Sequence, residues 1–209
     1  MAESASTSNV PRREVLKQLA ITMTAAGAAS VFNHEAARIV HALANEERQE
    51  NGEYTLKLFT ENEFATLSRL TELIVPADAN GGSGVDAGAP EFIDLLCSQN
   101  NDLADIYRGG LAWLDATMRH LGGTHFIIAA PENQTALLDA LVKSEQTSTD
   151  GELGPGVQFF RWVRRMTVDA YYTSPIGISD LQYQGNTAMT RFSVPQDTLD
   201  FTNREIERM

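Results

Sequence analysis

The sequence contains a single cysteine, Cys97, and this scarcity excludes several kinds of chemistry. One thiol can neither form an intrachain disulfide nor ligate an iron–sulfur cluster. No Cys-x-x-Cys-His motif is present to attach haem covalently. Because Cys97 ends the apolar run 92–97, we expect a buried and inert thiol. An intersubunit disulfide or a reactive thiol is the alternative.

Recognisable catalytic and cofactor motifs are also missing. The glycine loop 81–84 has no strand–helix–strand context, so it is not a dinucleotide-binding loop. The sequence has no phosphate-binding loop, nucleophile elbow or kinase signature. His120 and His125 stand on either side of two glycines, so no shared helical face presents both to one metal ion. We therefore expect no catalytic, cofactor-binding or metal-binding residue in this chain.

Basic residues are few, with 16 Lys and Arg against 28 Asp and Glu, which gives a formal net charge of -12. Nucleic acids and anionic lipid surfaces would repel a chain of this charge, so we expect no nucleic-acid partner. Hydrophobic residues make up 43% of the sequence, which is enough to build a core. A folded domain is therefore expected.

Long hydrophobic runs are absent as well, since spanning a bilayer takes about 20 apolar residues. The mild, Ala- and Thr-rich segment 19–29 follows a polar leader and the pair Arg12-Arg13, with Leu16 and Lys17 close behind. This order is typical of a twin-arginine export signal, and each guanidinium can grip a carboxylate of an acidic receptor. We predict recognition by the twin-arginine translocase and a periplasmic location. An ordinary amphipathic helix is the alternative.

The place where the signal ends is left open by the sequence. Residues 26–28 and 42–44 both satisfy the small-x-small rule for cleavage, and a retained signal would associate the protein with the membrane. We assign residues 1–44 to the signal and its linker, and 45–209 to the domain. The polar stretch 46–53, which follows this boundary, is interpreted as a linker at the start of the domain.

Helical patterns separated by turn residues fill the rest of the chain. Apolar residues recur at steps of three and four, capping residues precede them, and Gly or Pro follows them. The tail from about residue 172 shows little periodicity. We therefore predict an all-α fold, a single small domain of about five helices with a long irregular C-terminal arm. The expected helices cover 60–76, 90–97, 101–121, a segment from 131, and 157–171.

Two features suggest a partner-binding surface. Arg161, Arg164 and Arg165 form a local basic patch beside Trp162 in an acidic protein, and Arg and Trp are enriched at interface hot spots. The alternative is a solvated helix face in which Arg165 pairs with Asp169. The second feature is the aromatic area carried without helical spacing near and within the tail, at Tyr171, Tyr172, Tyr183, Phe192 and Phe201.

Three blocks together resemble a known family. They are the segment 70–78 with 88–94, the segment 159–161 continuing to 171–177, and the segment 181–186. With the twin-arginine leader, the chain resembles subunit 3, the small or gamma subunit, of gluconate 2-dehydrogenase-type complexes over roughly residues 60–190. One departure is Pro11, which stands before the arginines where Ser or Thr is usual.

The resemblance implies an accessory role without cofactor or catalytic residues. In such complexes a flavoprotein of the glucose-methanol-choline (GMC) type binds FAD, oxidises a sugar, sugar acid or glycoside, and passes electrons to a c-type cytochrome that carries haem c. The small subunit binds and stabilises the flavoprotein and escorts it through the translocase. Two other hypotheses stay open: a standalone periplasmic binding or scaffold protein, and an enzyme in its own right.

Overall fold

The computed structural model describes residues 14, 17, 34–79, 81–147, 151–182, 194 and 196–208. Within these residues the fold is entirely helical, with eight α-helices, one 3-10 helix and no strand. The all-α prediction is therefore confirmed, with more helices than the five expected. In chain order the elements are α2 (His34–Asn51), α3 (Glu61–Ile74), α4 (Ala89–Cys97), α5 (Asn101–Gly122), η2 (Phe126–Ile128), α6 (Pro131–Thr147), α7 (Gly154–Thr173), α8 (Pro175–Asp180) and α9 (Gln196–Glu207).

Capping residues set the ends of the best-predicted helices. Thr60 caps α3, and its side chain accepts a hydrogen bond from the Glu63 backbone while the Glu63 carboxylate accepts one from the Thr60 backbone. Asn100 caps α5 in the same manner through Leu103 N–H. α5 ends at Gly122, and the capping residue Gly123 has a φ of 75°, the left-handed conformation that favours glycine.

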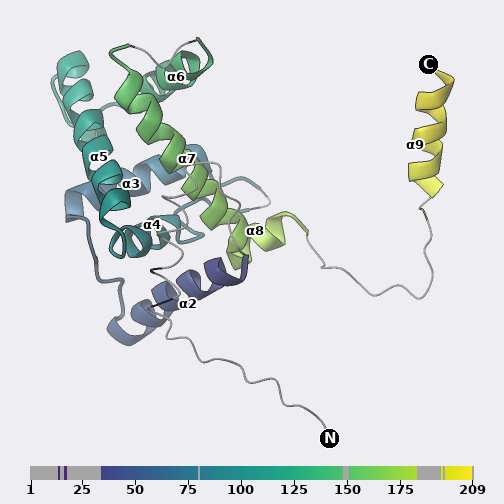
Figure 1. Ribbon diagram of the computed structural model, residues 1–209, viewed down its shortest axis with the longest axis horizontal. Helices are drawn as coiled ribbons and strands as arrows, with labels where there is room; N and C mark the ends of the chain where they lie inside the picture. The colour runs from purple at the N-terminus through teal and green to yellow at the C-terminus, as the bar shows by residue number, and fades with distance from the viewer. Residues whose placement is uncertain are drawn as a thin grey trace, which may run out of the picture.

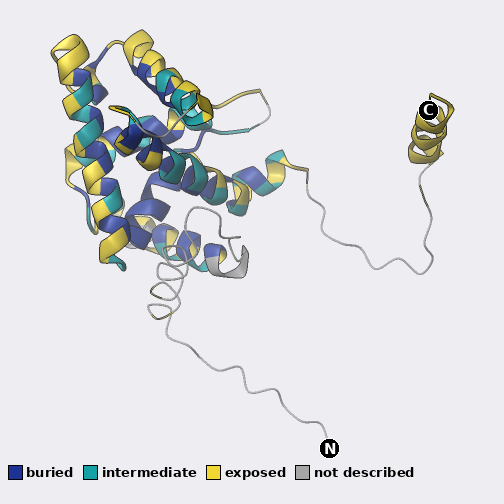
Figure 2. Cartoon of the chain, turned by 45° about the horizontal axis from the view of Figure 1, so that its top comes forward, coloured by how far each residue is buried: buried dark blue, intermediate teal, exposed yellow. Residues whose placement is uncertain are grey.

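Helix α7 runs through the middle of the bundle and packs against α2, α3, α4, α5, α6 and α8 (Figure 1). Its inner face buries Phe159, Val163, Met166 and Ala170, while Trp162 packs at the edge of the core. Figure 2 shows the buried residues, in dark blue, on the helices that pack together in the bundle. Because one helix contacts six others, the outer side of α7 is held in a fixed position.

Two glycines allow α5 and α7 to approach closely. A Cβ on Gly110 of α5 would collide with the ring of Phe159, and a Cβ on Gly156 of α7 would collide with the indole of Trp113. Each helix therefore inserts an aromatic side chain over a glycine of the other. The packing is reciprocal, and it fixes the position of α7 along α5.

Helix α4 is buried along its whole length, and it includes Cys97 at 1% exposure, so the expectation of a buried thiol is confirmed. Its fully buried Asp94 carboxylate accepts hydrogen bonds from the backbone N–H groups of Lys57, Leu58 and Phe59 and from the Tyr54 hydroxyl. Desolvation is thus offset by four donors. Asp94 fastens the chain between α2 and α3 to the core.

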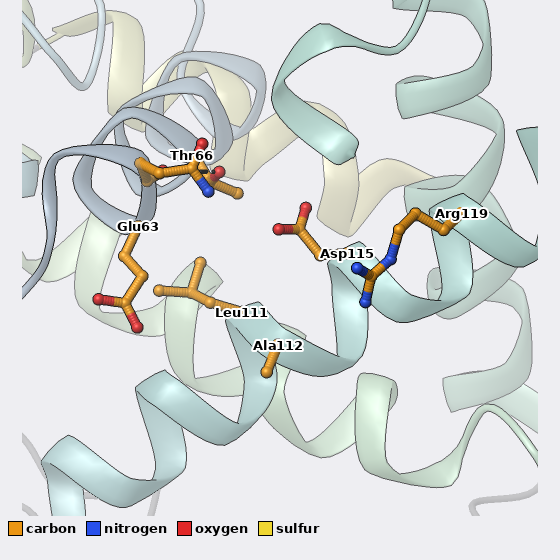
Figure 3. Close-up of a pocket in the computed structure, with 7 residues that line it drawn as sticks. Glu63, Thr66, Leu111, Ala112, Asp115 and Arg119 are labelled. Carbon is orange, nitrogen blue, oxygen red and sulfur yellow. Dashed lines mark hydrogen bonds between the residues drawn. The ribbon is translucent and has the colours of Figure 1, made fainter. Parts of the chain in front are cut away.

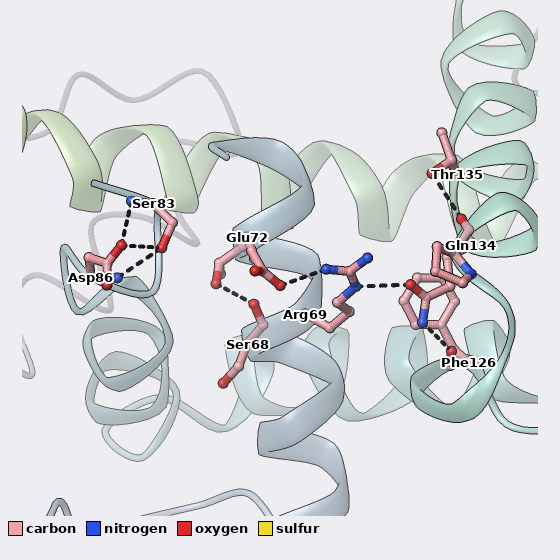
Figure 4. Close-up of polar contacts among 10 residues, drawn as sticks. Ser68, Arg69, Glu72, Ser83, Asp86, Phe126, Gln134 and Thr135 are labelled. Carbon is pink, nitrogen blue, oxygen red and sulfur yellow. Dashed lines mark hydrogen bonds and ion pairs between the residues drawn. The ribbon is translucent and has the colours of Figure 1, made fainter. Parts of the chain in front are cut away.

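A buried polar connection joins α3 to α6. Arg69 donates to the side-chain oxygen of Gln134 at 2.9 Å, and Gln134 in turn donates to the Phe126 carbonyl at 2.7 Å. Arg69 also pairs with Glu72 one turn further along its own helix. Figure 4 shows this chain of contacts, together with the Ser83–Asp86 turn that precedes α4.

The segment 46–53 is not the linker that we predicted, because α2 continues through it to Asn51. Ala37, Val40 and His41 of α2 are buried in the core, and the assigned boundary at residue 44 falls inside this helix. The buried face of α2 is made mostly of small or polar side chains, so the sequence shows only a weak hydrophobic period there. The structure also places α8 and α9 in the segment that we expected to be irregular.

Candidate functional site

The most exposed side of α7 combines basic, apolar and aromatic residues. Arg161, Arg165, Val168 and Tyr172 follow one another at steps of four, three and four, so they share one face of the helix. We call these four residues the α7 stripe. Val168 and Tyr172 are 37% and 41% exposed, which is high for large apolar side chains. A cavity of about 420 Å³ lies over the stripe, lined by Glu145, Arg161, Arg164, Arg165 and Val168.

The two arginines of the stripe and the neighbouring Arg164 are held in place by carboxylates. Glu145 of α6 accepts hydrogen bonds from Arg161 at 2.9 Å and from two nitrogens of Arg164, also at 2.9 Å. The hydrogen bond from Arg164, helped by Arg161, lowers the pKa of Glu145 against the opposing effect of desolvation. Among the described residues here, three arginines outnumber two carboxylates, Glu145 and Asp169, by one positive charge.

Arg165 pairs with Asp169 at 3.1 Å, the contact that the solvated-face alternative predicted. Partial burial nevertheless raises the pKa of Asp169 above its ordinary value. Arg164 also lies over the Phe160 ring, 5.5 Å from its centroid, an arrangement typical of a cation–π contact. The arginine side chains are therefore preorganised, with their positive charge kept at the surface.

The other residues of the predicted surface separate into different environments. Trp162 is half-buried against the core, and Tyr171 is 2% exposed, with its hydroxyl 3.3 Å from the Asp180 carboxylate that accepts its hydrogen bond. Tyr171 meets Tyr172 edge to face at 5.1 Å and so supports it from beneath. Of Trp162, Tyr171 and Tyr172, Tyr172 is the most exposed to solvent.

Several predicted residues lie outside the described part of the chain. These are Arg12, Arg13 and Leu16 of the export signal, and Tyr183 and Phe192 of the tail. Lys17 is described, and it is helical and exposed. Phe201 lies on α9 and is 58% exposed.

A second cavity, of about 240 Å³, lies between α3 and α5. Figure 3 shows Leu111 and Asp115 of α5 facing Thr66 and Glu63 of α3 across it. Asp115 already accepts hydrogen bonds from His125 and from the Phe126 backbone, and Glu63 belongs to the capping box of α3. The carboxylates of Asp115 and Glu63 are therefore both engaged in hydrogen bonds that hold the fold together.

A third cavity, of about 180 Å³, is lined by residues of α2, of α4 and of the start of α8. Glu91 is buried here and pairs with Arg48 of α2. His41 is also buried, and its ring donates to the Ala170 carbonyl at 3.0 Å. Burial lowers the pKa of His41 to about 4, against the opposing effect of that hydrogen bond, so the ring is neutral at pH 7.

Metal binding and thiol chemistry each require a particular arrangement among the described residues. No group of three or more His, Cys, Asp or Glu among them is placed to hold a metal ion. Burial raises the pKa of the Cys97 thiol well above its ordinary value, which keeps it protonated and unreactive. In the same part of the chain, no helix has the length and apolar character needed to cross a membrane.

Sequence reasoning missed two residues that matter to this arrangement. Asp94 could have been noticed as a carboxylate in the middle of an apolar run, which requires hydrogen-bond donors wherever it is buried. His41 carried no comparable signal, because its partners Ala170 and Thr173 are 129 and 132 residues away along the chain.

Comparison with known proteins gives one informative match. The family described as Gluconate 2-dehydrogenase subunit 3 matches residues 61–189, which include α3 to α8 and the whole α7 stripe. No curated protein and no solved structure matches the chain. The match covers more than half of the sequence. The chain belongs to the gluconate 2-dehydrogenase subunit 3 family.

Proposed function

We propose that this chain is a non-catalytic accessory subunit that binds and stabilises the catalytic subunit of a dehydrogenase. The family match over residues 61–189 is the observation that carries the proposal. The engagement of Asp94, Asp115 and Glu145 in internal contacts supports it, because these carboxylates are used to hold the fold. The exposed α7 stripe supports it as well, since it offers a binding surface.

The partner that fits this role is an FAD-dependent oxidoreductase of the GMC type acting on a sugar, a sugar acid or a glycoside. In this proposal FAD belongs to the partner, and haem c belongs to a c-type cytochrome that accepts the electrons. No cofactor is assigned to the chain itself. The substrate is then chosen by the catalytic subunit.

The contact with the catalytic subunit is proposed to include the α7 stripe. Arginine and tyrosine are among the residues that contribute most at protein interfaces, and an apolar residue such as Val168 between them excludes water. Tyr171 packs edge to face against Tyr172 of the stripe, and Trp162 of the same helix packs against the core. A preorganised surface loses little side-chain entropy on binding, which favours affinity. We extend the same role to Tyr183 and Phe192.

Export is the second half of the proposed role. The pair Arg12-Arg13 addresses the chain to a translocase that carries folded proteins, and a flavoprotein has to fold around FAD before it crosses. A partner without its own signal would then cross bound to this subunit. The complex would work in the periplasm, held at the membrane through other subunits or through a retained signal.

The escort role is tested by replacing Arg12 and Arg13 with lysine in cells that produce both subunits. Lysine keeps the charge but loses bidentate recognition, so both chains should remain in the cytoplasm. The measurement is the amount of each subunit, and of bound FAD, in periplasmic and cytoplasmic fractions.

The matched control is the pair Arg204→Lys and Arg208→Lys, the same change made outside the leader. Both subunits should then reach the periplasm in unchanged amounts. Normal export of the flavoprotein while the Arg12→Lys and Arg13→Lys chain stays behind would refute the escort role.

A further inference from the structure

Helix α9 is an amphipathic helix with no surface to cover its apolar side. Every described side chain of α9 is exposed, and Figure 2 shows the helix exposed along its length. Leu199, Thr202 and Ile206 follow at steps of three and four and form one face, with Leu199 41% and Ile206 63% exposed. Isolated helices shorter than about 12 to 15 residues are marginal in water. A helix of 12 residues is therefore expected to dock on something.

Charge narrows the choice of surface. Helix α9 carries Asp197, Asp200, Glu205 and Glu207 against Arg204, which is a net charge of -3. The chain as a whole is strongly acidic, so most of its own surface repels this helix. Among the described parts of the surface, the cavity over the α7 stripe differs, because three of its five lining residues are arginines. Its excess positive charge lies next to exposed apolar area on Val168 and Tyr172.

The lengths of the two elements also agree. The α7 stripe spans eleven residue steps from Arg161 to Tyr172, about 17 Å at the helical rise, and α9 is about 18 Å long. Residues 183–195 connect the turn that follows α8 to the start of α9, and they can span roughly 45 Å when extended. Helix α9, which Figure 1 draws apart from the bundle, is thus within reach of any point on α7.

We propose that α9 docks along the α7 stripe of its own chain. Leu199 and Ile206 would pack on Val168 and Tyr172, and the acidic residues of α9 would lie beside the arginines that line the cavity. This contact concerns the free chain and does not depend on the proposed escort function. If the stripe also binds the catalytic subunit, α9 would cover it until that subunit displaces the helix.

The test is a disulfide formed within the full chain. Val168→Cys and Ile206→Cys are introduced together, and both replaced side chains are exposed, so the fold should tolerate them; thermal unfolding checks this. The native Cys97 is buried and does not interfere. With oxidised glutathione, we expect the new pair to form an intrachain disulfide, seen as loss of two thiols and faster migration on a non-reducing gel.

The matched control pairs Val168→Cys with Arg204→Cys, which lies two residues away on the polar side of α9 with the same tether. Docking predicts that the Ile206 pair forms at least about tenfold faster, and that 0.5 M salt reduces this difference by screening the charges. Equal rates for the two pairs would overturn the proposal. Disulfide-linked dimers in place of monomers would also overturn it, because they would assign α9 to a second copy.

Discussion

Among single residues, His41 has the most informative environment. It comes from α2, donates its ring N–H to the Ala170 carbonyl of α7, and lies 4.9 Å from the ring of Phe92 on α4. It is 7% exposed, and burial lowers its pKa from 6.5 to about 4. One neutral imidazole therefore joins three helices, and its titration reports on whether they stay together.

His41 should make the fold less stable in mild acid. The unfolded chain takes up a proton as the pH falls through about 6.5, whereas the folded chain resists protonation down to about 4. The stabilisation is therefore complete above pH 6.5 and is lost as the pH falls towards 4, by about 2 kcal/mol at pH 5. The measurement is the free energy of unfolding in urea at pH 7.5 and pH 5.

The comparison variant is His41→Gln, which keeps an N–H donor in a similar place and does not titrate. Its loss of stability between the two pH values should be smaller than that of the wild type by about 2 kcal/mol. His120→Gln, a change at an exposed histidine, should behave as the wild type does. If His41→Gln shows the full acid loss, a different group controls it.

At the scale of elements, the crossing of α5 and α7 depends on glycine. Gly110→Ala should destabilise the fold by about 1 to 3 kcal/mol or more, because the new methyl group meets the ring of Phe159, which the core holds in place. The neighbouring Gly109 faces open space on the same helix. Gly109→Ala should therefore be neutral or stabilise the protein by up to about 1 kcal/mol.

Urea unfolding of the two variants decides this prediction. A third variant, Gly110→Ala with Phe159→Leu, should be more stable than the sum of the two single changes, because the smaller side chain leaves room for the methyl group. Additive losses would mean that Gly110 and Phe159 do not compete for space, and the reciprocal packing would be wrong.

The elements that could be predicted from the sequence are those with local signals. The capping box at Thr60 predicts the start of α3, and apolar residues at helical spacing over many residues predict α5 and α7. α2 was missed because its buried face uses Ala37, Val40 and His41, so its pattern resembles a polar linker. The glycine contacts could not be predicted, because which aromatic ring covers Gly110 depends on how two distant helices cross.

The same limit applies to the candidate site. Arg161, Arg165 and Tyr172 could be identified from residue type and spacing, and they do share an exposed face of α7. Glu145, which accepts a hydrogen bond from Arg161, could not be identified in this way, because it lies 16 residues earlier on another helix. Tertiary contact decides which arginines are paired and how much positive charge remains.

For the whole molecule, the position of α2 constrains how the proposed export signal could be removed. Cleavage after residue 44 would delete Ala37, Val40 and His41, all buried, whereas cleavage after residue 28 would leave α2 complete. Burying one valine is worth about 1.5 to 3 kcal/mol, a large part of the stability of a small domain. The exported protein should therefore begin upstream of His34.

N-terminal sequencing of the protein recovered from the periplasm, its proposed location, checks this directly, and two truncations measure the cost. A chain starting at residue 29 should unfold in urea as the full chain does. A chain starting at residue 45 should lose several kcal/mol, because removing the first part of α2 exposes the sides of α4 and α7 that it covers. Equal stability of the two truncations would mean that α2 contributes nothing to the core. In that case the boundary at residue 44, which the sequence suggested, would mark the true start of the domain.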